Sequence, residues 1–385
     1  MSWKRSFQVS GFVFAMHWMV LIVSVFAPIP HVKPMYLQLT HTPLDHLLQW
    51  DAQWYAVIAK YGYKVPLSAQ QAFVATGNKV PFAPLQATAY FPLLPLVIHT
   101  FRVIGALFIG NLVFYVGMVF MYVLFRERLS GTKTLFALLL YALNPDTVYG
   151  SALYPEAYTV LFSVLVIYGL QKGGKTGDTI ACIAGFLATV NHEMGILLVT
   201  LAWQYLRQRR IRMMVTYGLS VAAGWGLFSL YLWGRYGHPL AMFAAEKTWD
   251  RTWAVPGYNW IQSIITQRIP DDMTILIFVV MMVAYIVEVW RVDRHFAHPT
   301  AALALQSQGA AIWMSLLLMI GLSTYIPGDP VLSVSRLLSV GWPMYGFLWL
   351  RGEHRSLVWM IGILVVFLIT GIFGSSLYLH GILYG

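Results

Sequence analysis

Long apolar runs recur along the whole chain, separated by short polar or charged stretches. Most runs approach the length of about 20 residues that a helix needs to cross a bilayer. The short alternating segments of a membrane β-barrel do not occur. We therefore expect an all-α, multi-pass membrane protein in a single domain, 1–385, with about eleven crossings. The predicted segments are 10–29, 107–125, 134–150, 154–171, 178–190, 194–206, 213–233, 273–290, 308–326, 335–350 and 357–379.

The composition strengthens this interpretation. Hydrophobic residues make up 58% of the 385 residues and charged residues only 10%, whereas soluble domains carry about 25% charged residues. The net charge is +10, but the basic residues form short clusters between apolar runs. That arrangement suits membrane topology and anionic lipid headgroups, and it excludes nucleic acid as the expected partner. The single cysteine, Cys182, excludes an intramolecular disulfide.

The basic clusters predict which helix ends face the cytoplasm. Lys4 and Arg5 place the N-terminus there, and no small-residue cleavage site follows, so the first helix is expected to be retained. The short segment 89–105 holds two prolines, and we interpret it as a partial helix that does not cross. A full crossing would invert several later clusters, which otherwise all fall on the cytoplasmic side. Those clusters are Arg126/Arg128/Lys133, Lys172/Lys175, Arg207/Arg209/Arg210/Arg212, Arg291/Arg294 and Arg351/Arg355.

With this topology the long polar stretch 30–87 is the first exterior loop, and its amphipathic pieces should form helices in the membrane interface. The unusual polar groups then gather at the same exterior face, as a site facing the outer leaflet requires. They are Asp51, Asn144-Pro145-Asp146, Tyr154-Pro155-Glu156, Asn191-His192-Glu193, Arg235 to His238, Glu246 to Arg251 and Ser333 to Arg336.

Asp51 is the first candidate, and it lies among Trp50, Trp54 and Tyr55. An ionised carboxylate near the hydrocarbon boundary is costly unless it is paired or functional. As a general base it could take a proton from an acceptor hydroxyl while a phosphate leaves a sugar. The aromatic neighbours would offer stacking faces for sugar rings. The alternative is an interfacial helix in which the aromatic residues anchor the chain and Asp51 is a cap or the partner of a lysine.

Two further groups add acidic and histidine side chains. Tyr154 and Glu156 follow a helix break and could orient an acceptor or tune Asp51, although an ordinary capped loop would look the same. His192 and Glu193 lie between apolar runs, where buried polar groups must be paired. His192 could bind a phosphate or transfer a proton, unless the pair is only a polar hairpin tip. The second histidine of a zinc HExxH motif is missing, so we predict no metal site.

Arginines supply the candidate phosphate ligands. Arg336 opens a late helix from the exterior side, and Arg235 is a similar but weaker candidate. A guanidinium binds phosphate bidentately, whereas the alternative is a side chain that snorkels to the interface. The chain has no nucleotide-binding glycine motif, so the leaving group is expected to be a lipid phosphate reached from within the membrane.

Five short motifs in sequence order resemble the second GPI mannosyltransferase (phosphatidylinositol-glycan class V) family and its bacterial relatives. The resemblance spans roughly residues 50–345, and the chain departs from the family at His192, where the family usually has arginine. The motifs are Trp50-Asp51-Ala52-Gln53-Trp54-Tyr55 with Gly62-Tyr63, Tyr90-Phe91-Pro92-Leu93-Leu94-Pro95, Asn144-Pro145 through Tyr154-Pro155-Glu156, Tyr236-Gly237-His238-Pro239-Leu240 through Trp249, and Ser335-Arg336 through Pro343.

The resemblance implies a multi-pass cell-membrane glycosyltransferase of the GT-C type, which uses polyprenyl-phosphate sugars at the exterior (periplasmic, extracellular or lumenal) face and inverts the anomeric carbon. By this analogy Asp51 is the catalytic base and Glu156 a second acidic site residue. The expected reaction moves mannose or another hexose to a lipid or glycan acceptor. With the residues argued above, the predicted substrate-binding set is Trp50, Trp54, Tyr55, Tyr154, His192, Glu193, Arg235 and Arg336.

The sequence also leads to expectations about cofactors and to alternative functions. A lipid monophosphate donor demands no cofactor, although two acids could hold Mg²⁺ or Mn²⁺. Membrane lipids are the other expected partners. The first rival is a lipid or glycan transporter or flippase without transferase activity, which should show inverted repeats and charges near the bilayer midplane. A non-catalytic membrane subunit and an acyltransferase are further alternatives.

Overall fold

The computed structural model describes residues 3–29, 39–65, 85–266, 269–295, 307–347 and 357–382. Within these residues, five helices are long and apolar enough to cross a membrane. The expectation of an all-α membrane protein is confirmed to that extent, whereas the eleven crossings stay a prediction. The five are α1 (Trp3–Val25), α4 (Leu93–Phe125), α9 (Ile211–Tyr236), α12 (Ile269–His295) and α16 (Leu357–Leu379).

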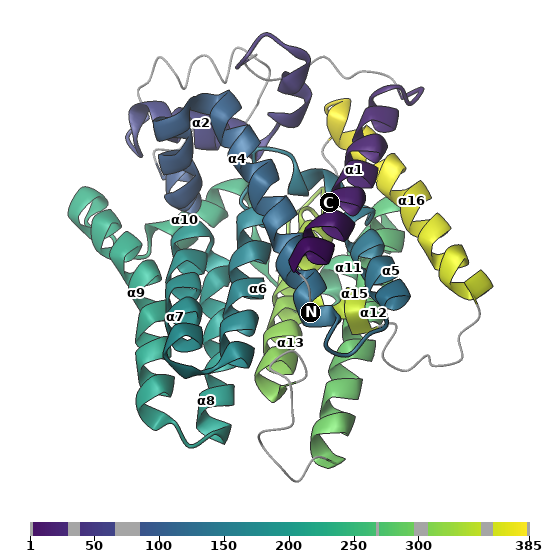
Figure 1. Cartoon of the computed structure of the whole chain (residues 1–385). Helices are drawn as coiled ribbons and strands as arrows, with labels where there is room; N and C mark the ends of the chain where they lie inside the picture. The colour runs from purple at the N-terminus through teal and green to yellow at the C-terminus, as the bar shows by residue number, and fades with distance from the viewer. Residues whose placement is uncertain are drawn as a thin grey trace.

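Shorter helices pack between and beside the long ones (Figure 1). They are α5 (Gly131–Ala142), α6 (Glu156–Lys172), α7 (Gly174–Asn191), the 3₁₀ helix η4 (Glu193–Ala202), α8 (Trp203–Arg207), α13 (Gln308–Ser323), α14 (Val334–Ser339) and α15 (Pro343–Phe347). Smaller elements complete the described chain: η1 (Pro43–Leu47), α2 (Asp51–Tyr61), η2 (Gln86–Ala89), η3 (Thr147–Gly150), α10 (Ala241–Glu246), η5 (Lys247–Trp249), α11 (Tyr258–Ile265) and the strands β1 (Thr252–Trp253) and β2 (Thr324–Tyr325).

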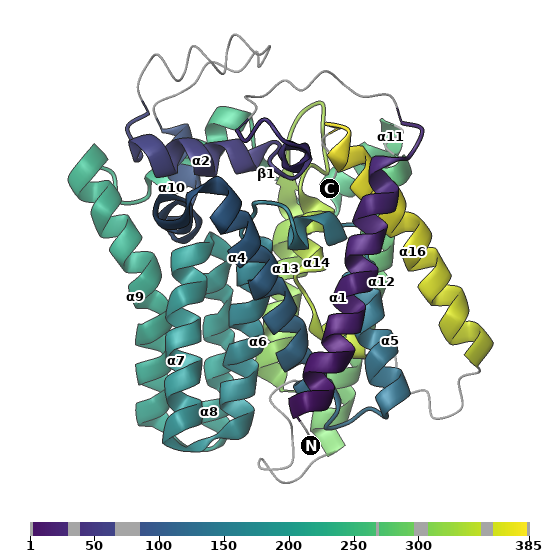
Figure 2. The same ribbon diagram turned by 45° about the horizontal axis from the view of Figure 1, so that its top comes forward.

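The bundle has two distinct ends (Figure 2). Helices α2 and α10 and strand β1 lie at one end, which we call the α2 end. There β1 and β2 pair antiparallel, with Thr252 opposite Tyr325. The start of α1 and the loop from α8 to α9 lie at the other end, which carries Lys4, Arg5 and Arg207 and which we call the basic end.

Helix α6 lies at the centre and is buried on nearly all sides, against α4 and α7. Its hairpin with α7 depends on two glycines. A Cβ on Gly169 would lie 2.5 Å from the carbonyl oxygen of Gly177, and a Cβ on Gly177 would lie 2.4 Å from that of Gly169. Small residues of this kind let helix backbones approach closely where lipid tails offer no hydrophobic driving force.

A buried histidine fastens α1 to the turn that follows α5. The ring nitrogens of His17 lie 2.7 Å from both the Thr147 and the Ser151 hydroxyl oxygens. The Ser151 hydroxyl in turn donates to Asn111 Oδ1 of α4, 2.6 Å away. The network joins three elements that are distant in sequence, and it helps to fix the turn from which the site residues project.

The segment 89–105 differs from its predicted form. It does not end before 107–125 but continues into it as α4, and the break falls at Arg102, whose φ is 63°. The part before the break is far shorter than the about 20 residues of a crossing. This agrees with the interpretation as a partial helix, and the side of the membrane on which it lies stays a prediction.

Three other predicted segments are divided, and one of them, 194–206, forms η4 and α8. The segment 335–350 forms two short helices, α14 and α15, because the chain turns at Gly341 and Trp342 ahead of Pro343. The segment 134–150 is helical only to Ala142, and 143–155 is a chain of turns that includes η3. The segment 30–87, predicted as the first exterior loop, contains η1 and α2 as helical pieces, while 30–38 and 66–84 lie outside the described residues, as do Arg351 and Arg355.

Candidate active site at the α2 end

Asp51 is the first residue of α2, and an unusual backbone conformation places it there. Trp50, the N-cap residue, has φ 56° and ψ −121°, a region that L-residues rarely adopt. Such strain concentrates at functional sites, where the surrounding structure enforces it. Here the Asp51 N–H donates to the Tyr154 hydroxyl at 3.1 Å, and that hydroxyl donates to the Gln49 carbonyl at 3.3 Å. Tyr154 therefore holds the start of α2 in position.

Arg336 of α14 connects the two predicted acids. Its Nη1 lies 2.8 Å from Asp51 Oδ2, and its Nε lies 3.2 Å from Glu156 Oε1. The guanidinium also stacks over the rings of Tyr149 and Tyr154, with centroid distances of 5.4 and 5.2 Å. Its side chain is 17% exposed, compared with 33% for Asp51. A delocalised cation between two carboxylates and two aromatic faces is a well-compensated buried charge.

The helix that carries Arg336 also begins at a strained residue. Ser333, the N-cap of α14, has φ 67°. Trp50 and Ser333 thus both lead into a helix whose first turn delivers a charged site residue. Strain at both positions supports the interpretation that the fold maintains the contact between Asp51 and Arg336, and not only the packing of the helices.

Tyr90 forms a hydrogen bond with the other carboxylate oxygen of Asp51. Its hydroxyl donates to Asp51 Oδ1 at 3.1 Å. Burial and the neighbouring Asp51 raise the pKa of Tyr90 well above its usual value, so the hydroxyl stays protonated and acts as a donor. Trp54 stacks on the Tyr90 ring at 5.4 Å and 15°, and Tyr55 packs edge-on at 5.0 Å. Both side chains are buried against the Tyr90 ring, and their role as sugar-stacking faces stays a prediction.

Glu156 is the first residue of α6, where the helix dipole favours a carboxylate. Its Oε1 contacts Arg336, and its buried Oε2 has no hydrogen-bond partner among the described residues. The carboxylate lines a small space of about 20 Å³ that is also lined by Asp146. That volume accommodates one water molecule, which would satisfy buried polar atoms of this kind.

Asp146 lies behind the site, in the turn between α5 and η3 and outside the long apolar helices. Its Oδ1 accepts a hydrogen bond from the Ser335 hydroxyl at 3.2 Å, and its backbone N–H donates to Asn144 Oδ1 at 2.8 Å. Its Oδ2 is buried without a partner among the described residues. Burial raises the pKa of Asp146 to about 7. The contact with Ser335 couples this acid to the residue that precedes Arg336.

His192 and Glu193 lie where α7 ends and η4 begins. His192 Nδ1 lies 3.3 Å from Glu193 Oε2 and also 3.2 Å from the Met194 backbone nitrogen. These contacts are alternatives, because Nδ1 accepts from the Met194 N–H only when it carries no proton of its own. Asn191 donates to the Pro155 carbonyl at 3.0 Å, which docks this junction against the start of α6 beside Glu156.

A second acid–arginine pair lies close to the first. Glu246 Oε2 is 3.2 Å from Arg251 Nε. Burial raises the pKa of Glu246, Arg251 lowers it, and the charges of Glu193 and Asp51 raise it further. Burial raises the pKa of Tyr55, and the charges of Asp51, Glu156 and Glu193 raise it further. Asp51, Glu156, Glu193 and Glu246 therefore share one electrostatic neighbourhood.

The structure brings some of the predicted site residues into contact and leaves others apart. Asp51, Tyr154, Glu156 and Arg336 form one contiguous cluster, with Trp50 as the cap that leads into it. Arg235 is exposed at the end of α9, and no hydrogen bond or ion pair joins it to that cluster in the described part of the chain. Sequence reasoning did not assign site roles to Tyr90 and Tyr149. The signal for Tyr90 was its place at the head of the Tyr-Phe-Pro motif.

The described residues do not fit a resident metal ion. They contain no group of three or more His, Cys, Asp or Glu side chains that could hold one. Asp51 and Glu156 both direct an oxygen at the guanidinium of Arg336, which already supplies the compensating charge. We therefore derive no chemical step through Mg²⁺ or Mn²⁺.

Comparison with known proteins adds one match. A family model described as Mannosyltransferase (PIG-V) matches residues 8–222, more than half of the chain. The matched region contains Asp51, Tyr90 and Glu156 and ends before Arg336. No curated protein and no solved structure matches the chain.

Proposed function

Because the chain belongs to the PIG-V mannosyltransferase family, we propose that it transfers mannose or another hexose from a polyprenyl-phosphate donor to a lipid or glycan acceptor. The transfer takes place at the exterior face of the cell membrane, in a GT-C-type fold, with inversion of the anomeric carbon. The observation that supports this proposal most is the contact of Arg336 with both Asp51 and Glu156 at the α2 end.

Arg336 binds the donor phosphate. In the free site its Nη1 is bonded to Asp51 and its Nε to Glu156. The phosphodiester of the donor carries one negative charge, as a carboxylate does, and presents oxygens that match the guanidinium fork. It therefore competes with Asp51 for Nη1, while the Nε contact with Glu156 keeps the guanidinium in place. Binding of the donor thereby releases Asp51 Oδ2.

Asp51 is the general base. The freed Oδ2 accepts the proton of the acceptor hydroxyl as its oxygen attacks the anomeric carbon from the face opposite the phosphate. The new bond joins acceptor oxygen to sugar, the bond from sugar to phosphate oxygen breaks, and the polyprenyl phosphate leaves with the electron pair. Tyr90 continues to donate to Oδ1 and so keeps the carboxylate oriented through the exchange.

The remaining residues shape the site around these two. The rings of Tyr149 and Tyr154 pack against the guanidinium of Arg336, and Glu156 binds its Nε. His192, Glu193 and the Glu246–Arg251 pair form the neighbouring wall and supply donors and acceptors for the acceptor's hydroxyls. The exposed Arg235 is left without a role in this scheme.

The decisive experiment uses the full chain in lipid nanodiscs. Radiolabelled polyprenyl-phosphate mannose, glucose and arabinose are supplied in turn with cell-envelope lipid extract, with and without chelator. We expect label to move to the acceptor from one of these donors, insensitive to chelator. Transfer from a nucleotide sugar without any polyprenyl phosphate would overturn the donor assignment. Uptake of labelled lipid into liposomes without transfer would instead favour the flippase.

A further inference from the structure

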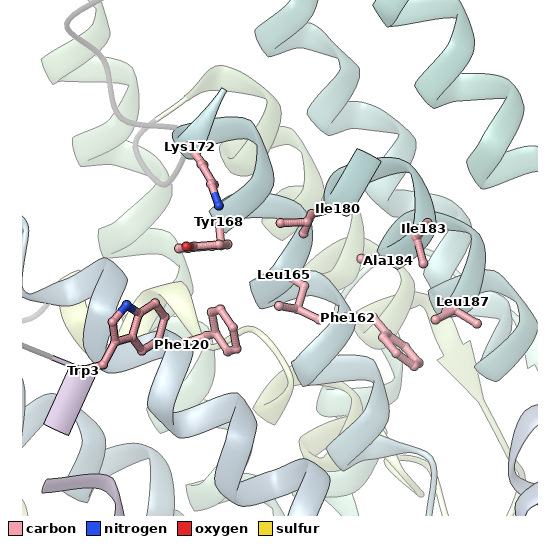
Figure 3. A pocket seen from close by; sticks show the side chains of 10 residues that line it. All are labelled: Trp3, Phe120, Phe162, Leu165, Tyr168, Lys172, Ile180, Ile183, Ala184 and Leu187. Carbon is pink, nitrogen blue, oxygen red and sulfur yellow. The ribbon is translucent and has the colours of Figure 1, made fainter. Parts of the chain in front are cut away.

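A long apolar groove lies along α6 and α7 and reaches Lys172, the last residue of α6, at the basic end. Figure 3 shows the side chains that line it. Its floor is α6, with Phe162, Leu165 and Tyr168, and its walls are Phe120 of α4 and Ile183 of α7. The volume is about 390 Å³. An apolar hollow of this size between membrane helices matches the cross-section and volume of a lipid chain better than that of a polar metabolite.

The length of the groove corresponds to one leaflet. Its lining on α6 extends from Phe162 to Lys172, ten residues along the helix, which is about 15 Å at a rise of 1.5 Å per residue. The hydrocarbon core of a bilayer is about 30 Å thick. An acyl chain of the leaflet at the basic end would therefore fill the groove and bring its headgroup to Lys172. Figure 3 shows the Lys172 side chain directed toward the ring of Tyr168 at this end of the groove.

A second cavity of about 300 Å³ adjoins the first and shares Trp3, Tyr168 and Lys172 with it. It is more polar, because Glu127 and Gln171 also line it. Both amide atoms of Gln171, Nε2 and Oε1, are buried without a hydrogen-bond partner in the described part of the chain. A buried amide that lacks both a donor and an acceptor partner is costly, so this cavity is expected to hold a polar group.

The charges in this cavity indicate which polar group fits. Lys172 Nζ lies 5.9 Å from the Tyr168 ring centroid, and no salt bridge joins Lys172 or Glu127 to an opposite charge among the described residues. Burial raises the pKa of Glu127, and the neighbouring Arg128 lowers it. One cation and one anion facing the same space complement a zwitterion. A phosphate would bind Lys172 and Gln171 Nε2, and an ammonium group would bind Glu127 and Gln171 Oε1.

We propose that the two cavities bind one molecule of a phospholipid with a primary-amine headgroup, its acyl chain lying along α6 and its phosphate at Lys172. The site is separate from the sugar-transfer site at the α2 end and does not depend on the proposed reaction. It makes the lipid a stoichiometric component that fills the space between α1, α4, α6 and α7 at the basic end.

The test is lipid retention by the full chain purified in mild detergent. Phosphatidylethanolamine, phosphatidylcholine and phosphatidylglycerol with identical acyl chains are added in equal amounts, and bound lipid is counted by native mass spectrometry. We expect phosphatidylethanolamine to be retained above phosphatidylglycerol. Lys172→Gln should lower the retention of phosphatidylethanolamine about tenfold, the effect of losing one hydrogen bond to a charged group. Glu127→Gln should lower it to the level of phosphatidylglycerol.

Lys175→Gln is the matched control, because it removes the same charge three residues further on and Lys175 does not line either cavity. Its retention should equal that of the wild type, and the thermal midpoint of each variant in detergent checks the fold. Equal retention of the three lipids by the wild type, or equal losses in Lys172→Gln and Lys175→Gln, would overturn the proposal. So would a dimer that Lys172→Gln dissociates, since the groove would then belong to a second copy.

Discussion

The two oxygens of the Asp51 carboxylate have different partners, and this difference has chemical consequences. Oδ1 accepts from a tyrosine that is wedged between two aromatic rings, whereas Oδ2 accepts from an arginine that has a second acidic partner. The tyrosine contact is fixed by packing. The arginine contact is exchangeable, because a phosphate can replace it. The Asp51 carboxylate is thus held in one orientation through Oδ1, while Oδ2 can become free to accept a proton.

Replacement of Asp51 by asparagine removes the base but keeps the shape of the side chain. We expect transfer to fall by at least about 100-fold, the usual contribution of a general base. Asp45→Asn is the matched control: Asp45 belongs to the same loop region, and its carboxylate accepts hydrogen bonds from Thr40. Transfer rates in nanodiscs give the comparison. Activity of Asp51→Asn within a few-fold of wild type would remove Asp51 as the base.

Tyr90→Phe tests the orienting contact. Loss of the hydroxyl removes one hydrogen bond to a charged group, so kcat should fall by about tenfold while KM changes less. Tyr61→Phe, at the exposed end of α2, serves as the control. Initial rates over a range of donor concentrations separate kcat from KM. If kcat is unchanged and KM rises, Tyr90 contacts substrate instead of orienting the base.

Asp146 predicts a pH dependence of stability. Its pKa is raised to about 7 in the folded protein, whereas an unfolded aspartate titrates near about 4. Between these values the folded state keeps a proton that the unfolded state has lost, so the free energy of unfolding falls as pH rises through this window.

Asp146→Asn should therefore become more stable relative to wild type between pH 5 and pH 8. The expected gain is a few kcal/mol at most, at about 1.4 kcal/mol for each unit of pKa shift. Thermal midpoints of both proteins in detergent at the two pH values give the comparison. A constant difference between the two proteins would show that Asp146 titrates normally.

At the scale of elements, the α6–α7 hairpin at the basic end is a tightly packed contact. Gly177→Ala would place a Cβ against the backbone of α6, which cannot move without shifting Glu156 at the other end of the helix. We expect a loss of about 1–3 kcal/mol in stability, as for other overpacked positions. Gly234→Ala in α9 is the control, since a Cβ there meets nothing within 4 Å. It should leave the melting temperature unchanged or raise it slightly.

The elements that the sequence predicted best are those with uniform lipid-facing apolar surfaces. The last helix matches its predicted bounds, 357–379, because its sequence is predominantly apolar and contains no proline or charged residue. The segment 335–350 was predicted as one helix because its hydropathy is continuous. Hydropathy does not register that Gly341 and Pro343 turn the chain and that Trp342 is fixed by a hydrogen bond from its Nε1 to Ser163, at 3.1 Å.

The candidate site could be predicted only as far as single residues signal function on their own. Asp51, Glu156 and Arg336 were identifiable because charge is costly in an apolar chain. Tyr90 was not, because its role depends on contact with α2. The burial of Trp54 and Tyr55 likewise depends on how α2 packs onto Tyr90, which the linear pattern does not contain.

At the scale of the whole molecule, the orientation in the membrane can be tested directly. In a Cys182→Ser background, a cysteine at His238 lies at the exposed end of α9 near the α2 end, and a cysteine at Lys175 lies at the opposite end. The basic clusters predict that an impermeant maleimide labels intact cells at 238 but not at 175. Lysed cells should be labelled at both positions. The reverse pattern in intact cells would place the candidate site in the cytoplasm.

The contact between Asp51, Glu156 and Arg336 also constrains how the protein is made. The acids lie in the first half of the chain, whereas the guanidinium that balances them is encoded near residue 336. During synthesis, the emerging chain therefore carries both acids before their counter-charge exists. The site closes only when α14 is inserted, so an incompletely translated chain carries the acids without a working centre.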